Sequence, residues 1–212
     1  ELKWESPRSI KFLERVNHPT VPTIYPPMAQ YVFRTVHFFQ PDSILAMRLA
    51  FLIFDVLALF FIIGILGKLA LNINMSGIYF WCPLIIKETF NSTHLDIIGI
   101  SFLCGSVYFL VHKRHTLATF FLALGFLGKL YPAILFPLYI QACFQKSKKS
   151  KENPWRIPIL NTLFFVGIII LGYTPFMGIG LHMFDGLKAY SLYWESNDSI
   201  FACFLFLFKS LP

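Results

Sequence analysis

Long stretches without charged residues constrain this chain more than any other feature of its sequence. Residues 43–66 carry only two charges, Arg48 and Asp55, and residues 97–111 and 157–176 carry none. A helix needs about 20 apolar residues to cross a bilayer core of about 30 Å. Only 14% of the 212 residues are charged, against roughly 25% in soluble domains. The sequence therefore predicts an all-α, polytopic transmembrane protein.

Residues 116–144 allow two interpretations, one tilted span or two short legs broken at GKLYP, residues 128–132. Pro132 disfavours helix at the residue before it but suits the first turn of a new helix. With two legs, the basic runs HKRH (112–115) and KSKKSK (146–151) fall on one side of the membrane. This agrees with the excess of basic residues in cytoplasmic loops, so we prefer two legs.

A shorter apolar run, residues 77–86, is interrupted by Trp81-Cys82-Pro83. It has about half the length that a spanning helix needs. We expect it to cross the membrane only if the polar residues beside it join the crossing.

The alternation of spans assigns each connecting segment to one side. The predicted cytoplasmic segments are 67–76, 112–115 and 145–156. The predicted outer segments are 1–42, 87–96, 129–132 and 177–199. Of the 11 acidic residues, all except Asp55 and Glu152 then lie on the outer face. Because carboxylates contribute little to membrane orientation, this collection predicts a functional site there, with a solvated loop surface as the competing explanation.

The segment KETFNSTHLD, residues 87–96, places Glu88, His94 and Asp96 in one outer loop, and Lys129 lies at the tip of the predicted hairpin. A carboxylate accepts a proton from an attacking hydroxyl, and a lysine holds a phosphate. These groups suit chemistry on a lipid-linked polar substrate. Each also has a structural explanation, because the loop could simply join two spans and Lys129 could extend to the lipid headgroups.

Two charged residues lie inside the first span. Arg48 and Asp55 are seven residues apart, about two helical turns along one face. Charges at this depth normally face protein or water rather than lipid. We expect the two side chains to form a structural pair.

Charge and cysteine content argue against other classes of function. The net charge of +7 does not come from an aromatic-interleaved basic patch, so nucleic acid is not an expected partner. The four cysteines show no CxxC spacing, and no Asp-x-Asp pair occurs. The sequence indicates no metal site and no cofactor, although metal dependence stays open.

Four motifs in order resemble those of polytopic glycosyltransferases of the GT-C type, most closely bacterial family 87-like enzymes that use polyprenyl-phosphate mannose. NHPTVPTIYPPMAQ (17–30) is similar to their first extracytoplasmic loop, which leads into a span with an acidic residue, here Asp55. KETFNSTHLD resembles their next outer loop, although Asn91 and Ser92 stand where the family often has glycine. GKLYP resembles their helix break, and also that of the GPI-anchor mannosyltransferase catalytic subunit. GLKAYSLYWESNDSIF (186–201) resembles their late loop.

The resemblance implies a GT-C-like fold and an inverting transfer of a sugar, with mannose expected, from a polyprenyl-phosphate donor to an acceptor hydroxyl at the extracytoplasmic face. The acceptor would be a glycan or a lipid-linked molecule, and membrane lipids would surround the protein. The candidate catalytic residues are Glu88, His94 and Asp96. The candidate substrate-binding residues are Asn17, His18, Tyr25, Lys129, Tyr131, Trp194 and Asn197.

In the family the usual general base follows the first span, which by this comparison would precede Glu1. We therefore expect residues 1–212 to form part of one multi-span domain, truncated at both ends. A bacterial plasma membrane is the preferred location, and the endoplasmic reticulum is the alternative. Two other functions stay open. One is a transporter or lipid flippase in which Arg48 and Asp55 line a path, and the other is a non-catalytic membrane subunit.

Overall fold

Every regular element in the described part of the chain is a helix. The computed structural model describes residues 23–149, 153–193 and 206–208, and these contain no strand. The longer helices are α2 (Pro27–Phe39), α3 (Ile44–Lys68), α6 (Asp96–Val111), α7 (His115–Gly128), α8 (Phe136–Lys149), α9 (Arg156–Tyr173) and α10 (Asp185–Tyr193). The shorter elements are η1 (Ile73–Met75), α4 (Ser76–Phe80), α5 (Pro83–Ile86), η2 (Lys87–Asn91) and η3 (Tyr131–Leu135), and the kinked 3-10 segment η4 (Thr174–Phe184) joins α9 to α10. The predicted all-α class is confirmed.

The longest uninterrupted helix, α3, begins at a capped end. The Ser43 hydroxyl accepts a hydrogen bond from Ala46 N at 3.2 Å, which satisfies one of the free amides of the first turn. Its 25 residues span about 37 Å at about 1.5 Å per residue. The helix predicted over residues 43–66 is therefore confirmed to within two residues at each end.

Two stretches are long and apolar enough to cross a membrane, Ile44–Lys68 and Arg156–Leu192. Only 17% of the apolar window of each is buried, whereas the core helix of a soluble protein is mostly buried. α6 and α7 are apolar as well, but shorter. Large apolar surfaces of this kind are unfavourable in water, so the exterior is that of a membrane protein. The exposed side chains on α3 and α9 include Ile44, Leu45, Leu49, Ile53, Val56, Phe60, Ile159, Leu160, Leu163, Val166, Ile170 and Leu171.

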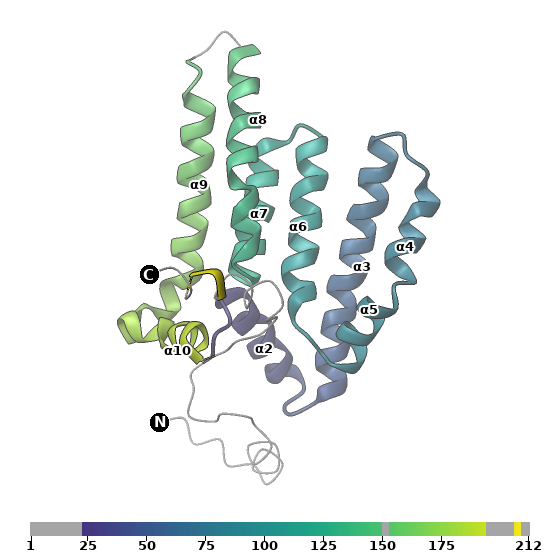
Figure 1. Ribbon diagram of the computed structural model, residues 1–212, viewed down its shortest axis with the longest axis vertical. Helices are drawn as coiled ribbons and strands as arrows, with labels where there is room; N and C mark the ends of the chain where they lie inside the picture. Colours follow the sequence, from purple (N-terminus) through teal and green to yellow (C-terminus); the bar gives the residue numbers. More distant parts are fainter. Residues whose placement is uncertain (1–22, 150–152, 194–205, 209–212) are drawn as a thin grey trace.

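A sharp break separates α7 from α8. α7 ends at Gly128, and Lys129 is extended, with φ −157° and ψ 144°. η3 follows with Pro132 in its first turn, where the missing N–H of proline costs no hydrogen bond. Figure 1 shows that α7 runs toward this break and that α8 runs back from it, so the two helices are antiparallel. The interpretation of residues 116–144 as two legs is confirmed.

The chain returns from the far end of α3 through short helices rather than one long helix. Trp81 caps the end of α4, Cys82 is extended, and Pro83 starts α5. A single π-helical turn, Lys87–Asn91, continues the return, and Figure 1 shows α4 and α5 beside α3. The polar residues 87–91 thus continue the return that begins in the run 77–86.

The core lies between the long helices and contains paired polar groups. One cluster of buried side chains joins α2, α3 and α6, and a second joins α7, α8 and α9. Inside the second, the Ser106 hydroxyl donates to Ala118 O at 2.7 Å and shares a 2.7 Å hydrogen bond with the Tyr139 hydroxyl. Thr119 Oγ1 donates to Asn161 Oδ1 at 3.1 Å. Buried polar groups are stable only when paired in this way.

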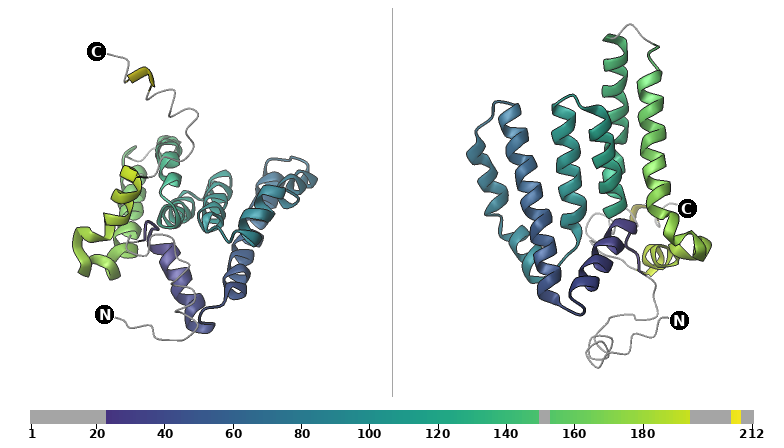
Figure 2. Two further views of the ribbon diagram at one scale, coloured as in Figure 1. Left: turned by 60° about the horizontal axis from the view of Figure 1, so that its bottom comes forward. Right: turned by 180° about the vertical axis from the view of Figure 1, so that it is seen from behind.

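The connecting segments gather at the two ends of the helices. Figures 1 and 2 show α2, α5, the break between α7 and α8, and α10 at the same end, which is the lower end in Figure 1. The loop joining α6 to α7 and the end of α8 lie toward the opposite end. The loop 87–96 therefore shares its end of the molecule with the Lys129 break.

We predict that a methyl group added at Gly105 destabilises the α3–α6–α7 contact. A Cβ there would lie 2.5 Å from Phe121 Cδ1 and 2.7 Å from Phe61 Cε2, so two packed rings would have to move. Overpacking of this kind costs about 1–3 kcal/mol. Thermal unfolding in detergent should show a lower Tm for Gly105→Ala. Gly67→Ala is the control, because no atom lies within 4 Å of the added Cβ. Equal Tm values for the two variants would contradict this packing.

Candidate functional site

The loop of residues 87–96 is held in shape by its own backbone and by α3. His94 N donates to Glu88 O at 2.8 Å, which closes the loop on itself. Arg48 Nη2 of α3 donates to Asn91 O at 3.3 Å. The loop therefore presents its side chains from a fixed backbone.

Within this loop, Glu88 lies between two basic partners. Its Oε2 is 3.2 Å from His94 Nε2, and its Oε1 is 3.8 Å from Lys87 Nζ. The side chains of Glu88 and His94 are 36% and 59% exposed, so solvent and a ligand can reach both. Exposed pairs contribute about 0–1 kcal/mol to stability. The contact orients the carboxylate more than it stabilises the fold.

Asp96 and Lys129 come from separate parts of the chain and form an ion pair. Asp96 is the first residue of α6, and Lys129 directly follows α7. Their side chains are 48% and 37% exposed. A half-exposed pair adds little to stability, so the two charges can be replaced without unfolding the protein.

Glycines explain why Lys129 lies so close to the start of α6. A Cβ on Gly128 would lie 3.3 Å from Gly99 N, and a Cβ on Gly99 would lie 3.2 Å from Lys129 Cβ. Gly125 adds to the same contact, because its O would be 3.7 Å from that Cβ on Gly99. Side chains at these positions would separate α6 from α7. Their absence lets the lysine reach the carboxylate.

Tyr131 stands beside this pair. Its hydroxyl lies 3.6 Å from the position of a Cβ on Gly99. Partial burial and the nearby Asp96 carboxylate raise the pKa of the Tyr131 phenol to about 12. The hydroxyl therefore keeps its proton at neutral pH and can donate a hydrogen bond to an anion.

A pocket of about 310 Å³ lies between the broken return and α6. Glu88, His94 and Asp96 line it together with Tyr79, whose hydroxyl donates to Asp55 Oδ1 at 2.6 Å. The remaining lining is mainly apolar, from Leu84, Ile85, Ile97 and Ile100. Small-molecule sites typically combine apolar walls with a few polar groups. This is the candidate site.

The chemistry available there is proton transfer and anion binding. Two carboxylates and an imidazole can accept or orient a proton, and Lys129 supplies a cation for a phosphate. Within the described residues, no group of three His, Cys, Asp or Glu side chains could hold a metal ion. The arrangement suits group transfer from a phosphate-linked donor.

The other predicted site residues do not join this cluster. Tyr25 lines a separate pocket of about 300 Å³ with Leu130, Tyr173 and Leu187. Leu130, which also lines that pocket, directly follows Lys129 in the chain. The remaining candidates lie outside the described residues: Asn17, His18, Trp194 and Asn197.

The expected pairing of Arg48 with Asp55 is wrong. Arg48 bonds to the carbonyl of Asn91, and Asp55 accepts from Tyr79. Seven residues of helix separate the two along the axis by about 10 Å, and helical side chains lean toward the N-terminus. The arginine therefore reaches the loop at the helix start while the aspartate meets α4. The two charged side chains therefore belong to different contacts.

Tyr79 is not among the site residues that the sequence predicts. This residue lies in the short run 77–86, which looked purely apolar apart from its break. One signal was available, because an aspartate inside a span needs a hydrogen-bond donor. Several tyrosines could have served, and only the fold selects the one on α4.

Comparison with known proteins agrees with the geometry. The model of glycosyltransferase family 87 matches residues 23–192, a region that contains the loop 87–96 and Lys129. No curated protein and no solved structure matches the chain. Since the match covers most of the 212 residues, the chain belongs to glycosyltransferase family 87 and is a membrane-associated member of that family.

Proposed function

We propose that this protein transfers mannose from a polyprenyl-phosphate donor to an acceptor hydroxyl at the extracytoplasmic face of a membrane, with inversion at the anomeric carbon. The observation that carries the proposal is the contact between Asp96 and Lys129 beside the pocket that Glu88 and His94 also line. A cation, two carboxylates and an imidazole meet at one end of helices whose outer faces are apolar.

In this proposal Lys129 binds the donor phosphate. The ammonium group is a compact charge that can exchange one anionic partner for another, so it can leave Asp96 for the phosphate when the donor enters. Tyr131, whose phenol stays protonated, can donate a further hydrogen bond to the same phosphate. The apolar side chains of α5 and α6 that line the pocket suit the first isoprene units of the donor.

The carboxylates act on the acceptor. Glu88, oriented by His94, and Asp96, released from Lys129, bind the acceptor hydroxyl and assist its deprotonation. The hydroxyl oxygen forms a bond to the anomeric carbon from the side opposite the phosphate. The carbon–phosphate oxygen bond breaks, polyprenyl phosphate leaves with the electron pair, and the proton passes to a carboxylate. Inversion follows from this single displacement.

The distribution of basic residues supports a multi-pass arrangement with the site outside. Lys113 and Arg114 follow α6, and Lys146 and Lys148 lie near the end of α8. These segments lie at the end opposite the site. Cytoplasmic loops carry an excess of basic residues, so this end would face the cytoplasm of a bacterium, the preferred location.

We predict that Lys129→Ala, Asp96→Ala and Glu88→Ala each lower transfer. Removing one preorganised electrostatic contact to a transition state costs about 100-fold or more in rate. The measurement is mannose transfer from radiolabelled polyprenyl-phosphate mannose by the full-length protein in proteoliposomes. Lys68→Ala, an exposed lysine at the end of α3, is the control and should keep full activity. Unchanged rates in all three site variants would remove these residues from the mechanism.

Gly99→Ala is expected to lower the rate of mannose transfer although it replaces no charged residue. The new methyl would lie 3.2 Å from Lys129 Cβ and displace the lysine from Asp96. Small displacements of a binding group lower rates by about tenfold or more. Transfer rate should fall relative to Gly67→Ala, where nothing lies near the added atom. A rate equal to that of the control would show that the glycine contact does not position Lys129.

Single-cysteine labelling tests the sidedness. In a background without the native cysteines, Asn91→Cys should react with a membrane-impermeant maleimide from outside intact cells. Lys148→Cys should react only after the membrane is opened, because α8 carries it to the opposite end. Reaction of both positions from the same side would contradict the proposed topology.

A further inference from the structure

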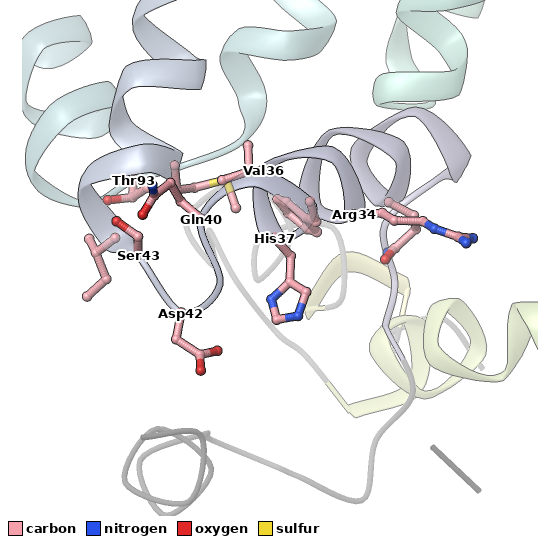
Figure 3. A pocket seen from close by; sticks show the side chains of 11 residues that line it. Arg34, Val36, His37, Gln40, Asp42, Ser43 and Thr93 are labelled. Carbon is pink, nitrogen blue, oxygen red and sulfur yellow. The ribbon is translucent and has the colours of Figure 1, made fainter. Parts of the chain in front are cut away.

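A second and larger pocket lies on the other side of the loop 87–96. Its volume is about 920 Å³, and α2 and the start of α3 form most of it (Figure 3). The left view of Figure 2 shows α2 and α3 diverging from the turn that joins them. The lining residues are Gln30, Phe33, Arg34, Val36, His37, Gln40, Asp42, Ser43, Ile44, Met47 and Thr93. This set shares no residue with the pocket of Glu88 and Asp96.

The loop residue Thr93 connects the two pockets. Thr93 lines the larger pocket, whereas the next residue, His94, lines the smaller one and contacts Glu88 at 3.2 Å. Consecutive side chains thus belong to opposite sides of one loop. A ligand that contacts Thr93 in the larger pocket would therefore contact the residue next to His94, which orients the Glu88 carboxylate.

The backbone at Thr93 is strained. Its φ is 55°, a conformation that β-branched residues rarely adopt. Such a conformation costs about 1–3 kcal/mol and persists where the surroundings impose it. The hydrogen bonds from Arg48 to Asn91 O and from His94 N to Glu88 O hold the backbone on both sides of Thr93. The strained turn brings the threonine into the larger pocket.

The polar lining of this pocket is mixed rather than of one charge. Gln40, Ser43 and Thr93 supply amide and hydroxyl groups, and His37 and Asp42 line the same pocket (Figure 3). Amide and hydroxyl groups both donate and accept hydrogen bonds, which matches the hydroxyls of a sugar or another polyol. A lining that includes both an arginine and an aspartate does not select a polyanion.

The apolar lining adds a complementary surface. Phe33, Val36, Ile44 and Met47 lie between the polar groups, and a pyranose ring presents C–H groups on its faces. Sites for small ligands combine such apolar walls with a few polar groups, within about 300–1,000 Å³. The volume of about 920 Å³ lies within this range.

We propose that this pocket binds the neutral, hydroxyl-rich end of the acceptor, and that the loop 87–96 separates it from the donor site while holding His94 and Glu88 between them. This inference rests on the proposed transfer. It assigns to Gln40, Ser43 and Thr93 a role in acceptor recognition, in which they bind hydroxyls that do not react.

The decisive variant is Thr93→Gly. It removes the hydroxyl but also relieves the strained φ, so the protein should unfold at the same temperature as the wild type or higher. The binding probes are methyl mannoside, methyl glucoside, methyl galactoside and myo-inositol. They are measured by saturation-transfer NMR on the full-length protein in a detergent without a sugar headgroup. At least one probe should bind saturably, and Thr93→Gly should weaken it threefold or more.

A second variant and a matched control separate the pocket from the surface. Gln40→Ala should weaken the same probe threefold or more, and Gln141→Ala, an exposed glutamine on α8, should not. The proposal is overturned if no neutral probe binds saturably. It is also overturned if Thr93→Gly and Gln40→Ala bind as the wild type does, or if inorganic phosphate displaces the probe.

Activity measurements keep this inference distinct from the proposed function. Lys129→Ala should lose mannose transfer and still bind the probe, because the lysine does not line the larger pocket. If Thr93→Gly transfers mannose with an unchanged KM for the acceptor, the larger pocket does not bind the acceptor, and the proposed transfer function still holds. A third outcome is also informative. If the protein transfers no mannose, but binds a probe saturably and loses affinity in Thr93→Gly and Gln40→Ala, the larger pocket binds polyols and the proposed mannosyl transfer is refuted.

Discussion

The contact between α6 and α7 at their glycines is the interaction on which this end of the molecule depends. Gly99 and Gly128 let the two backbones approach closely, and Lys129, at the end of α7, lies against the first turn of α6. Because that first turn begins with Asp96, an acid at the start of α6 and a base at the end of α7 meet. The same turn is the end of the loop that carries Glu88 and His94, so one packing contact positions four titratable groups.

The apolar exterior explains why these groups gather at an end. Along α3 and α9 most of the surface is apolar and exposed, and a polar side chain there needs a partner inside the protein. Tyr79 supplies one for Asp55 of α3, and Thr119 supplies one for Asn161 of α9. Groups that must remain reachable by a polar ligand are therefore confined to the connecting segments. Membership in glycosyltransferase family 87 agrees with a site formed by such segments.

Much of the helical layout could be predicted, because its causes are local. The span over 43–66 follows from a long apolar run with only two charges, and the break before Pro132 follows from the geometry of proline. The loop 87–96 stood out because its charges interrupt two apolar segments. The pairing of Arg48 with Asp55 failed because a shared helix face does not decide between partners. Each residue found a closer group on another element, Asn91 for the arginine and Tyr79 for the aspartate.

By itself the sequence determined the class of protein, the positions of its long helices and the segments in which its chemistry lies. These depend on hydrophobicity, helix length and proline, which act over a few neighbouring residues. The tertiary structure alone decided which side chains meet, with Lys129 against Asp96 and His94 against Glu88. It also placed Thr93 in a second pocket beside α2. Such contacts join residues distant in sequence, and their distances depend on how closely whole helices pack.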